Sequence, residues 1–302
     1  MKKSFKILIG SLVVIAVLFG LVWHTGSDQN LEVYFFNVGQ GDGILIRTPS
    51  QQNIIIDGGP DNAFITKLGQ ALPFYDQQID LMVLTHPHAD HLFGLIEVLK
   101  RYRVKRVLYS GVVFNNSAYD EWLKQIKQKQ IPLVFARAGQ DYRFGQVELK
   151  VLFPIKSEAG QVIKETAGEG SVAGQENLNN TSVVTQLIYG QTKILFMGDL
   201  EAPGEEEILK SNPAGLASQV IKIGHHGSAT ASSQRFLAQV KPQDAVIQVG
   251  LDNKFNLPNA WVLGRLKRLK IGIWRTDLLG DIKLFADGFK LKLGPVFKQS
   301  SP

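Results

Sequence analysis

The stretch His86-Pro87-His88-Ala89-Asp90-His91 is the most informative part of this 302-residue chain. It follows the apolar run Leu81–Thr85, so it lies where a buried strand ends and the chain turns, and its proline blocks a helix there. Alternation and the turn let the first two histidines point one way, while the aspartate and the last histidine point another. Three imidazoles and one carboxylate within six residues therefore favour a metal site, with one metal on each pair.

The composition limits which ligands such a site can use. The chain is 44% hydrophobic and 20% charged, which are globular values and argue against a disordered or fibrous protein. It has no cysteine, which excludes disulfides, thiolate metal sites and cysteine nucleophiles. Any metal must be held by histidine, carboxylate or neutral oxygen ligands.

Strand-like and helical runs predict one α/β domain of stacked sheet with helices outside. Apolar strand-like segments end in turn residues, at Val33–Asn37, Gly43–Thr48, Asn53–Ile56, Leu81–Thr85, Arg106–Tyr109, Leu133–Ala136, Gln146–Phe153, Ser182–Tyr189, Lys193–Met197, Gln219–Ile223 and Ala245–Val249. Helical patterns lie between them, at Leu92–Arg103, Ala118–Gln130, Glu205–Lys210, Ser232–Val240 and Trp261–Lys270. Residues 157–180 are rich in Gly, Glu, Gln and Asn, which predicts a long loop or an insertion.

The N-terminus has the pattern of a membrane anchor. Residues 1–6 are basic and residues 7–23 are uncharged, long enough at about 1.5 Å per residue to approach the thickness of the hydrocarbon core. Because no small-residue cleavage signature follows, an uncleaved anchor is favoured over a cleaved signal peptide. The basic start then keeps the N-terminus cytoplasmic and places the rest outside, in a single-pass membrane protein. The predicted organisation is an anchor at 1–24, a linker at 25–30, a main α/β domain at 31–293 and a tail at 294–302.

The net charge of +6 is unevenly distributed. Residues 254–302 carry ten Lys or Arg and three Asp, so the rest of the chain sums to −1. This excess indicates either a surface that faces a polyanion or an ordinary solvated helix face with a basic tail, and the sequence leaves both open.

Several motifs in order resemble the metallo-β-lactamase superfamily. Besides the histidine cluster, these are Ile54-Ile55-Ile56-Asp57-Gly58-Gly59, Leu195-Phe196-Met197-Gly198-Asp199 and Lys222-Ile223-Gly224-His225-His226-Gly227-Ser228. Three further stretches, together with the His225-His226-Gly227-Ser228 part of the last motif, narrow the resemblance to the extracellular hydrolase domain of the ComEC DNA-uptake family: Phe36-Asn37-Val38-Gly39-Gln40-Gly41-Asp42, Asn179-Asn180-Thr181-Ser182 and Arg275-Thr276-Asp277. The resemblance covers about residues 31–293 and implies a four-layer αββα sandwich.

The resemblance also implies roles for individual residues. The implied ligands of two divalent ions, zinc or manganese with magnesium as a further option, are His86, His88, Asp90, His91, Asp199 and His225. Asp199 would bridge the two ions, which would share a hydroxide, and His226 would face the substrate as a phosphate contact or proton donor, so that Asp90, Asp199 and His226 are the expected catalytic residues. The implied supporting or substrate-contacting residues are Asp42, Asp57, Asn180, Ser182, Ser228, Arg275 and Asp277.

Two departures from the family pattern affect these expectations. No histidine lies between His91 and His225, where many superfamily members carry one. Asn180 or Ser182 is expected near that position, which would make the first metal site richer in oxygen and favour Mn²⁺ or Mg²⁺ over a purely zinc site. Leu257 stands where ComEC-like chains often have a histidine before proline.

Together these features predict a membrane-anchored, metal-dependent phosphodiesterase or nuclease. It would act on DNA outside the cytoplasmic membrane, with single-stranded DNA as the expected substrate and the DNA-uptake machinery as a possible partner. Two alternatives stay open. One is a metallohydrolase of another ester or a small phosphodiester, and the other is a non-catalytic nucleic-acid-binding domain with a decayed site.

Overall fold

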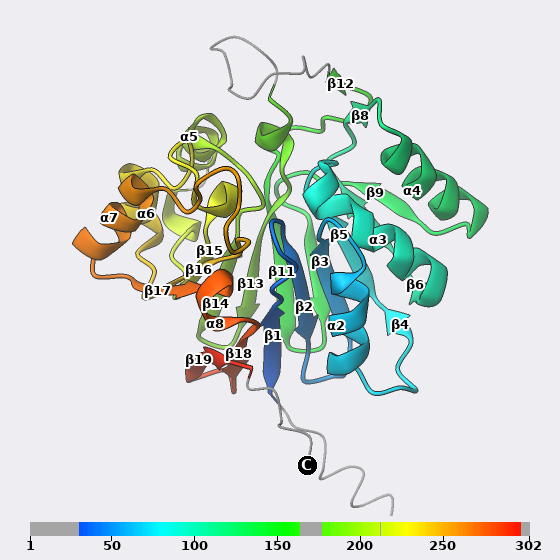
Figure 1. Ribbon diagram of the computed structural model, residues 1–302, viewed down its shortest axis with the longest axis horizontal. Coiled ribbons are helices and arrows are strands. Elements are labelled where there is room, and N and C mark those ends of the chain that lie inside the picture. The colour runs from blue at the N-terminus through cyan, green and yellow to red at the C-terminus, as the bar shows by residue number, and fades with distance from the viewer. Residues whose placement is uncertain (1–29, 164–176, 212, 297–302) are drawn as a thin grey trace, which may run out of the picture.

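The computed structural model describes residues 30–163, 177–211 and 213–296, which form two facing sheets between two layers of helices (Figure 1). The first sheet contains, in spatial order, β19 (Leu291–Pro295), β18 (Ile282–Ala286), β1 (Leu31–Phe35), β2 (Gly43–Arg47), β3 (Asn53–Gly58), β5 (Leu81–Leu84), β7 (Val107–Tyr109) and β9 (Leu133–Phe135). Pairing is antiparallel from β19 to β3 and parallel from β3 to β9.

The second sheet repeats this division into an antiparallel and a parallel half. Its order is β10 (Asp141–Phe144), β11 (Val147–Phe153), β13 (Val184–Tyr189), β14 (Thr192–Phe196), β15 (Val220–Lys222), β16 (Asp244–Ile247) and β17 (Gly272–Arg275). Pairing is antiparallel up to β14 and parallel beyond it. Two short ribbons pair β12 (Val162–Ile163) with β8 (Val113–Phe114), and β4 (Gln78–Ile79) with β6 (Arg103–Val104).

Side-chain alternation explains why each sheet is buried on both faces. In β2, Ile44 and Ile46 join the core between the sheets, while Leu45 joins the core under the outer helices. In β3, Ile54 and Ile56 face inward and Ile55 outward in the same way. The near-continuous apolar runs in the sequence are the pattern expected of strands that are covered on both sides.

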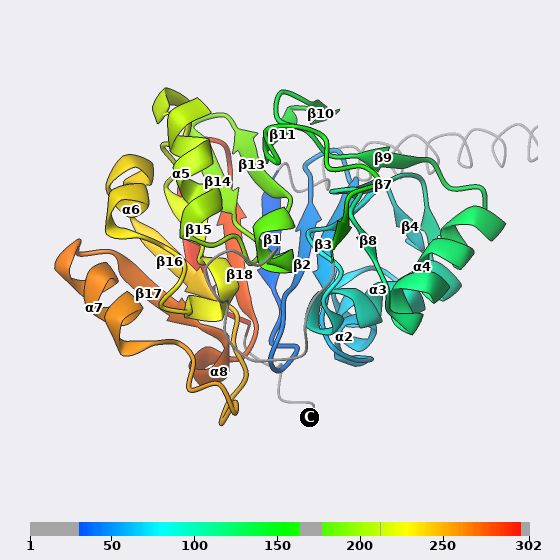
Figure 2. The same cartoon turned by 90° about the horizontal axis from the view of Figure 1, so that it is seen from above.

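Helices cover the outer face of each sheet (Figure 2). The first sheet is covered by α2 (Ala63–Ala71), α3 (Ala89–Arg101) and α4 (Ser117–Gln128). The second is covered by α5 (Ala202–Ser211), α6 (Gln234–Val240) and α7 (Ala260–Arg268). Shorter helical segments are η1 (Leu178–Thr181), η2 (Pro213–Gly215), η3 (Gly224–Gly227) and α8 (Thr276–Leu279). The expected α/β architecture, with helices outside layered sheet, is confirmed.

The sequence analysis missed some elements and could not be tested on others. Helix α2 and the strands β10, β17, β18 and β19 were not expected, and α3 begins three residues earlier than the apolar periodicity indicated. The edge strands β17 and β19 are only partly buried, so their sequences lack the apolar runs that marked the central strands. The expected anchor at 1–24 lies outside the described residues. None of the helices within those residues is both long and apolar enough to span a bilayer.

Candidate metal centre

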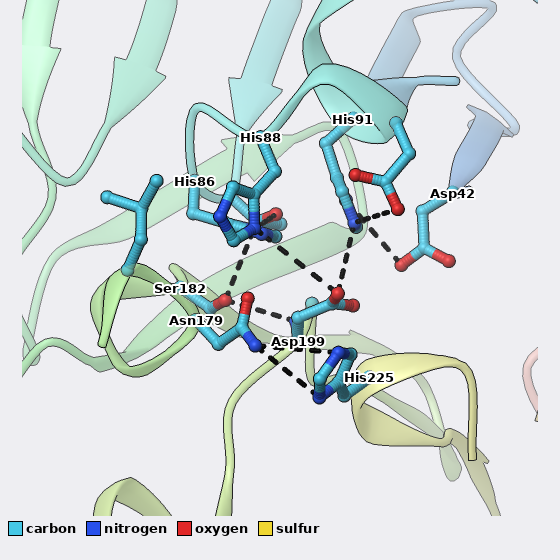
Figure 3. Close-up of polar contacts among 12 residues, drawn as sticks. Asp42, His86, His88, His91, Asn179, Ser182, Asp199 and His225 are labelled. Carbon is cyan, nitrogen blue, oxygen red and sulfur yellow. Dashed lines mark hydrogen bonds and ion pairs between the residues drawn. The ribbon is translucent and has the colours of Figure 1, made fainter. Parts of the chain in front are cut away.

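The site lies where parallel strands of both sheets end. Strand β3 leads to Asp57, β5 leads to the histidine cluster, β14 is followed by Asp199, and β15 is followed by the His225–His226 pair. Carboxyl ends of parallel strands meet at one edge of a sheet, which is the usual place for a ligand site in α/β folds. Residues more than a hundred positions apart thus converge on one centre (Figure 3).

A close backbone approach positions helix α3 at this edge. A Cβ atom on Gly94 would lie 1.9 Å from the carbonyl oxygen of Gly58, so only glycine allows the helix to pack this tightly on the end of β3. The helix begins at Ala89 with His88 as its N-cap and Asp90 in its first turn. The partial positive charge of a helix N-terminus stabilises a carboxylate there.

His86 and His88 form the first group of donors. Nε2 of His86 and Nδ1 of His88 lie 2.8 Å apart, and Oδ2 of Asp199 lies 4.0 Å from His86 Nε2. The His86 ring is fully buried. The two nitrogens therefore point into a common space beside Asp199.

Asp90, His91, Asp199 and His226 form the second group, with one donor atom of each lying within 4.8 Å of all the others. Oδ2 of Asp199 is 3.3 Å from Nε2 of both His91 and His226, and Oδ2 of Asp90 is 3.2 Å from His226 Nε2. All but Asp90 are almost completely buried. One carboxylate, that of Asp199, thus lies between the two groups of imidazoles.

Each buried imidazole is held by its other nitrogen. Nδ1 of His226 donates to the carbonyl oxygen of Gln248 at 3.0 Å, and Nδ1 of His91 donates to Oδ2 of Asp57 at 2.8 Å. Nδ1 of His86 lies 3.1 Å from the Thr85 hydroxyl, which already donates its hydrogen to Asp57 and so must accept from the ring. In their neutral form all three rings therefore direct the Nε2 lone pair into the site, which is the arrangement metal-binding histidines need.

Protonated histidines balance the negative charge of the buried carboxylates in this centre. Burial alone would lower the pKa of His91 and of His226, but the surrounding carboxylates, Asp199 foremost, raise the pKa of each well above its usual value. Burial would raise the pKa of Asp199, yet His226 and His91 hold it well below its usual value. Burial, helped by the neighbouring histidines, lowers the pKa of His86 well below its usual value. The donor set thus combines ionised carboxylates with imidazoles, and Oδ1 of Asp199 and Nε2 of His91 lack a hydrogen-bond partner among the described residues. Such a set fits divalent cations.

A family comparison agrees with this geometry. Residues 36–250 match the model of the metallo-beta-lactamase superfamily, which is more than half of the chain. The chain belongs to the metallo-beta-lactamase superfamily.

Curated relatives narrow the relationship within that superfamily. The chain is 26% identical over 284 residues to ComE operon protein 3 of Bacillus subtilis, covering 88% of this chain and 34% of that protein. It is 27% identical over 257 residues to the competence protein ComA of Neisseria gonorrhoeae, covering 85% and 32%. Both are ComEC-family competence proteins, so the expected resemblance is confirmed. The chain spans about a third of the length of these relatives.

Solved structures support the fold alone, at low identity. The metallo-beta-lactamase fold protein YhfI from Bacillus subtilis superposes with a TM-score of 0.50 at 10% identity, covering 87% of this chain and all of that one. The diiron beta-hydroxylase CmlA from Streptomyces venezuelae gives 0.51 at 15% identity, covering 85% and 54%. The family match supports a metal-dependent hydrolase.

The geometry exchanges the roles expected of the two adjacent histidines. His226, and not His225, joins the cluster of Asp90, His91 and Asp199. The ring of His225 lies beside Glu201, with Nδ1 3.0 Å from Oε1, and its side chain is 27% exposed. Both residues of the turn have positive φ angles, 46° and 51°, a conformation costly for non-glycine residues and one that directs the two rings apart. The geometry therefore favours His226 over His225 as the candidate ligand, because sequence alone does not show which ring this turn buries.

Three site residues received no role from the sequence. Lys222 is completely buried, and its ammonium contacts the carboxylate of Asp42 and, at 3.0 Å, the carbonyl of Gly198. Glu201 accepts from the His225 ring, and Asn179 lies against both. Two features of the sequence could have pointed to these residues. One is a lysine within the apolar run of β15, and the other is a glutamate two residues after Asp199.

The remaining expected residues lie at different distances from the cluster. Asp57 accepts from Nδ1 of His91, and Ser182 Oγ accepts from the backbone N–H of Asp199 at 3.0 Å. Asn180 turns away from the cluster, since its Oδ1 accepts from the N–H of Glu201. Ser228 joins the His225 side of the site through the Thr230 hydroxyl, 2.9 Å away.

The C-terminal motif forms its own pair. Arg275 and Asp277 make a double contact of 3.0 and 2.5 Å with each other. Thr276, between them, accepts from Val249 N–H and so supports the loop that follows β16. Leu257 lies in that loop and packs against the core under α5–α7. The following Pro258 contacts the turn at Gly227, where an added Cβ would lie 2.6 Å from the proline Cβ.

Proposed function

We propose that this chain is a two-metal phosphodiesterase that cleaves DNA, with single strands as the preferred substrate. The observation that carries the proposal is the position of Asp199. A single oxygen of its carboxylate lies 3.3 Å from the Nε2 atoms of His91 and His226 and 4.0 Å from that of His86, so one carboxylate reaches both groups of donors.

The residues present fit two divalent cations, with zinc or manganese favoured and magnesium also compatible with oxygen ligands. His86 and His88 would hold the first ion, and Asp90, His91 and His226 the second, with Asp199 shared. Such a pair supplies an activated water near neutral pH and neutralises charge on a phosphoryl oxygen.

The chain's own groups keep this centre in position. Asp57 and the Gln248 carbonyl hold the rings of His91 and His226 so that Nε2 of each faces inward. His225, on the more open side and oriented by Glu201, is placed to contact a phosphate or to donate a proton to the leaving oxygen. This is the role first expected of its neighbour.

Two features support a polyanionic substrate. The similar proteins are competence proteins, and the basic C-terminal region includes helix α7, on which Lys267 and Arg268 are exposed. Of the aromatic residues that could stack on bases, Phe36 and Tyr109 are buried in the core, whereas Phe255 is 46% exposed on the loop after β16. Base stacking on exposed aromatics beside cationic groups is the usual mode of single-strand binding.

The proposal includes the location. Residues 7–23 would anchor the chain in the cytoplasmic membrane with the hydrolase domain outside, where it could work with a DNA-uptake machinery. Protease added to spheroplasts should remove a C-terminal tag. A protected tag, or a shortened product free in the medium, would contradict this arrangement.

Hydrolysis by the purified full chain decides the activity. Metal-loaded protein in detergent should cleave single-stranded DNA, and Asp199→Asn should not. Turnover of only a small phosphodiester or another ester would point to the first alternative function. DNA binding without any turnover would point to a non-catalytic domain.

A further inference from the structure

The first group of donors, His86 and His88, lacks the further histidine that many superfamily members carry. The structure offers a different atom in its place. All six histidines of the chain are accounted for at positions 24, 86, 88, 91, 225 and 226. Among the expected ligands, Asp199 supplies the carboxylate near this group, with its Oδ2 4.0 Å from Nε2 of His86. A further donor must come from an oxygen atom of the chain or from solvent.

Asn179 carries such an oxygen. The residue lies on η1, is 6% exposed, and its Oδ1 has no hydrogen-bond partner among the described residues. Leaving a buried carbonyl oxygen unpaired costs about 1–3 kcal/mol. In Figure 3 the amide oxygen of Asn179 points toward the part of the site that contains His86 and His88, and the amide nitrogen points toward His225.

Glu201 fixes this orientation of the amide. Its Oε1 lies 3.3 Å from Asn179 Nδ2, and a carboxylate can only accept, so the NH₂ group must face Glu201 and the oxygen must face away. Asn177, Thr230 and His225 also place donors 2.8–3.0 Å from this carboxylate. These contacts hold the carboxylate in place, and the fixed carboxylate keeps the amide from turning over.

The two residues first considered for this position are already engaged. Asn180 Oδ1 accepts from the backbone N–H of Glu201 at 3.2 Å. Ser182 Oγ accepts from the backbone N–H of Asp199 at 3.0 Å and lies 3.4 Å from His86 Nδ1, the nitrogen that faces away from the site.

We propose that the amide oxygen of Asn179 is the missing ligand of the metal held by His86 and His88, and that Glu201 is the positioning residue that aims it. This inference rests on the two-metal site of the proposed function. It makes the two positions unequal, because the first has one shared carboxylate and a neutral amide, whereas the second has two carboxylates. The first position should therefore bind metal more weakly, and its affinity should depend on Asn179.

Stepwise metal binding to the full chain tests this proposal without reference to activity. Mn²⁺ and Zn²⁺ are titrated into the chelator-treated protein in detergent, with calorimetry for the affinities, native mass spectrometry for the number bound and electron paramagnetic resonance for the manganese environment. Asn179→Ala should weaken the second, weaker binding step at least about tenfold and leave the stronger step unchanged. Asn62→Ala, the same substitution at an exposed asparagine that makes no side-chain cap hydrogen bond, is the control and should leave both steps as in the wild type.

Three further variants keep the proposal falsifiable if Asn179→Ala unfolds. Asn179→His supplies an imidazole and should shift the weaker step toward zinc over manganese. Glu201→Gln should weaken that step, whereas Asn179→Asp combined with Glu201→Gln should restore it, since two equivalent carboxylate oxygens need no orienting partner. A merely structural role of Glu201 would not give this rescue.

The outcomes separate this inference from the proposed function. If the wild-type protein binds fewer than two ions, the two-metal site of the proposed function is itself refuted. Wild-type protein that binds two ions, with Asn179→Ala indistinguishable from it in both steps, would overturn only the role of Asn179. The same holds if Asn179→Ala raises KM for DNA while both metal affinities stay unchanged, which would make the amide a substrate contact.

Discussion

The ammonium of Lys222 pairs with the carboxylate of Asp42 in a fully buried position, and Asp199 Oδ1 lies 3.8 Å from the same ammonium. The pair links β15 of one sheet to the loop after β1 of the other, and Asp42 lies 3.4 Å from Nδ1 of His226 and 3.9 Å from Nδ1 of His91. Removing one partner of a buried ion pair leaves an uncompensated charge, which typically costs about 3–5 kcal/mol.

We therefore predict that Lys222→Met lowers the free energy of unfolding by about 3–5 kcal/mol, and that Lys222→Met with Asp42→Asn recovers a substantial part of the loss. Denaturant unfolding of the two single variants and the double variant measures the coupling. Lys267→Met, an exposed lysine on α7, is the matched control and should change stability little. Additive effects of the two buried substitutions would mean that the pair is not a unit.

The exchange of roles between His225 and His226 gives a second prediction. His226→Ala should lower the number of metal ions bound, because it removes a ring whose Nε2 lies 3.3 Å from Asp199. His225→Ala should keep the metals but lower kcat by about 10²–10⁴-fold, the usual worth of a proton-transferring group. Elemental analysis and single-turnover cleavage separate the two effects. Metal loss in His225→Ala with normal loading in His226→Ala would restore the original assignment.

Substituting Asp199 and Asp90 tests whether the site catalyses hydrolysis. Asp199→Asn and Asp90→Asn should each reduce phosphodiester hydrolysis at least about a hundredfold, since each 1.36 kcal/mol of lost transition-state stabilisation is about tenfold in rate. Circular dichroism should show little loss of folded structure. Asp252→Asn, at an exposed aspartate, serves as the control. Near wild-type turnover in either site variant would identify its carboxylate as a structural feature only.

These residues also show how far sequence could predict the site. The cluster from His86 to His91 follows an apolar strand, and its spacing alone indicated metal binding, while the ends of β3 and β14 followed from the family motifs. The sequence could not separate His225 from His226, because that difference comes from two positive φ angles in one turn. It also could not show that Asn180 faces a backbone N–H while Asn179 faces the site, since adjacent residues of a 3₁₀ helix point in different directions. Central strands were predictable from their apolar runs, whereas the half-exposed β17 and β19 were not.

The stabilisation of the fold by bound metal should depend on pH, and the buried histidines determine whether it grows or falls as pH rises. The pKa values of His91 and His226 are raised by carboxylates, chiefly Asp199, against the effect of burial, so their protonated rings stabilise the metal-free fold below the unfolded pKa of about 6.5. This contribution is lost as pH rises through the raised folded values. Asp199 has a lowered pKa, so its contribution is present above about pH 4 and lost in acid.

Because metal must displace the protons on the two rings, its effect should grow with pH. We expect the metal-induced rise in Tm to be larger at about pH 8 than at about pH 6. Thermal unfolding with and without Mn²⁺ across this range measures it. An equal rise at both values would show that no ring proton is released on binding.

Binding of single-stranded DNA should weaken steeply with salt, because lysines and arginines that neutralise phosphates release counterions. The exposed cationic groups at the end of α7, Lys267, Arg268 and Lys270, are the candidates, while Arg265 is engaged with the carbonyl oxygens of Ala231 and Ser232 at 3.0 and 3.1 Å.

Log affinity should fall linearly with log salt, at about −0.7 per contacted phosphate, and replacing the three exposed residues with alanine should flatten the slope by up to about two units. Fluorescence anisotropy over a salt series in metal-free buffer measures binding without cleavage. Arg143→Ala and Arg103→Ala together form the control, because these exposed arginines lie on β10, at the opposite edge of the second sheet from β17, and on β6. An unchanged slope in the triple variant would mean that α7 is only a solvated outer helix, and no binding at low salt would move the substrate to a small phosphodiester or another ester.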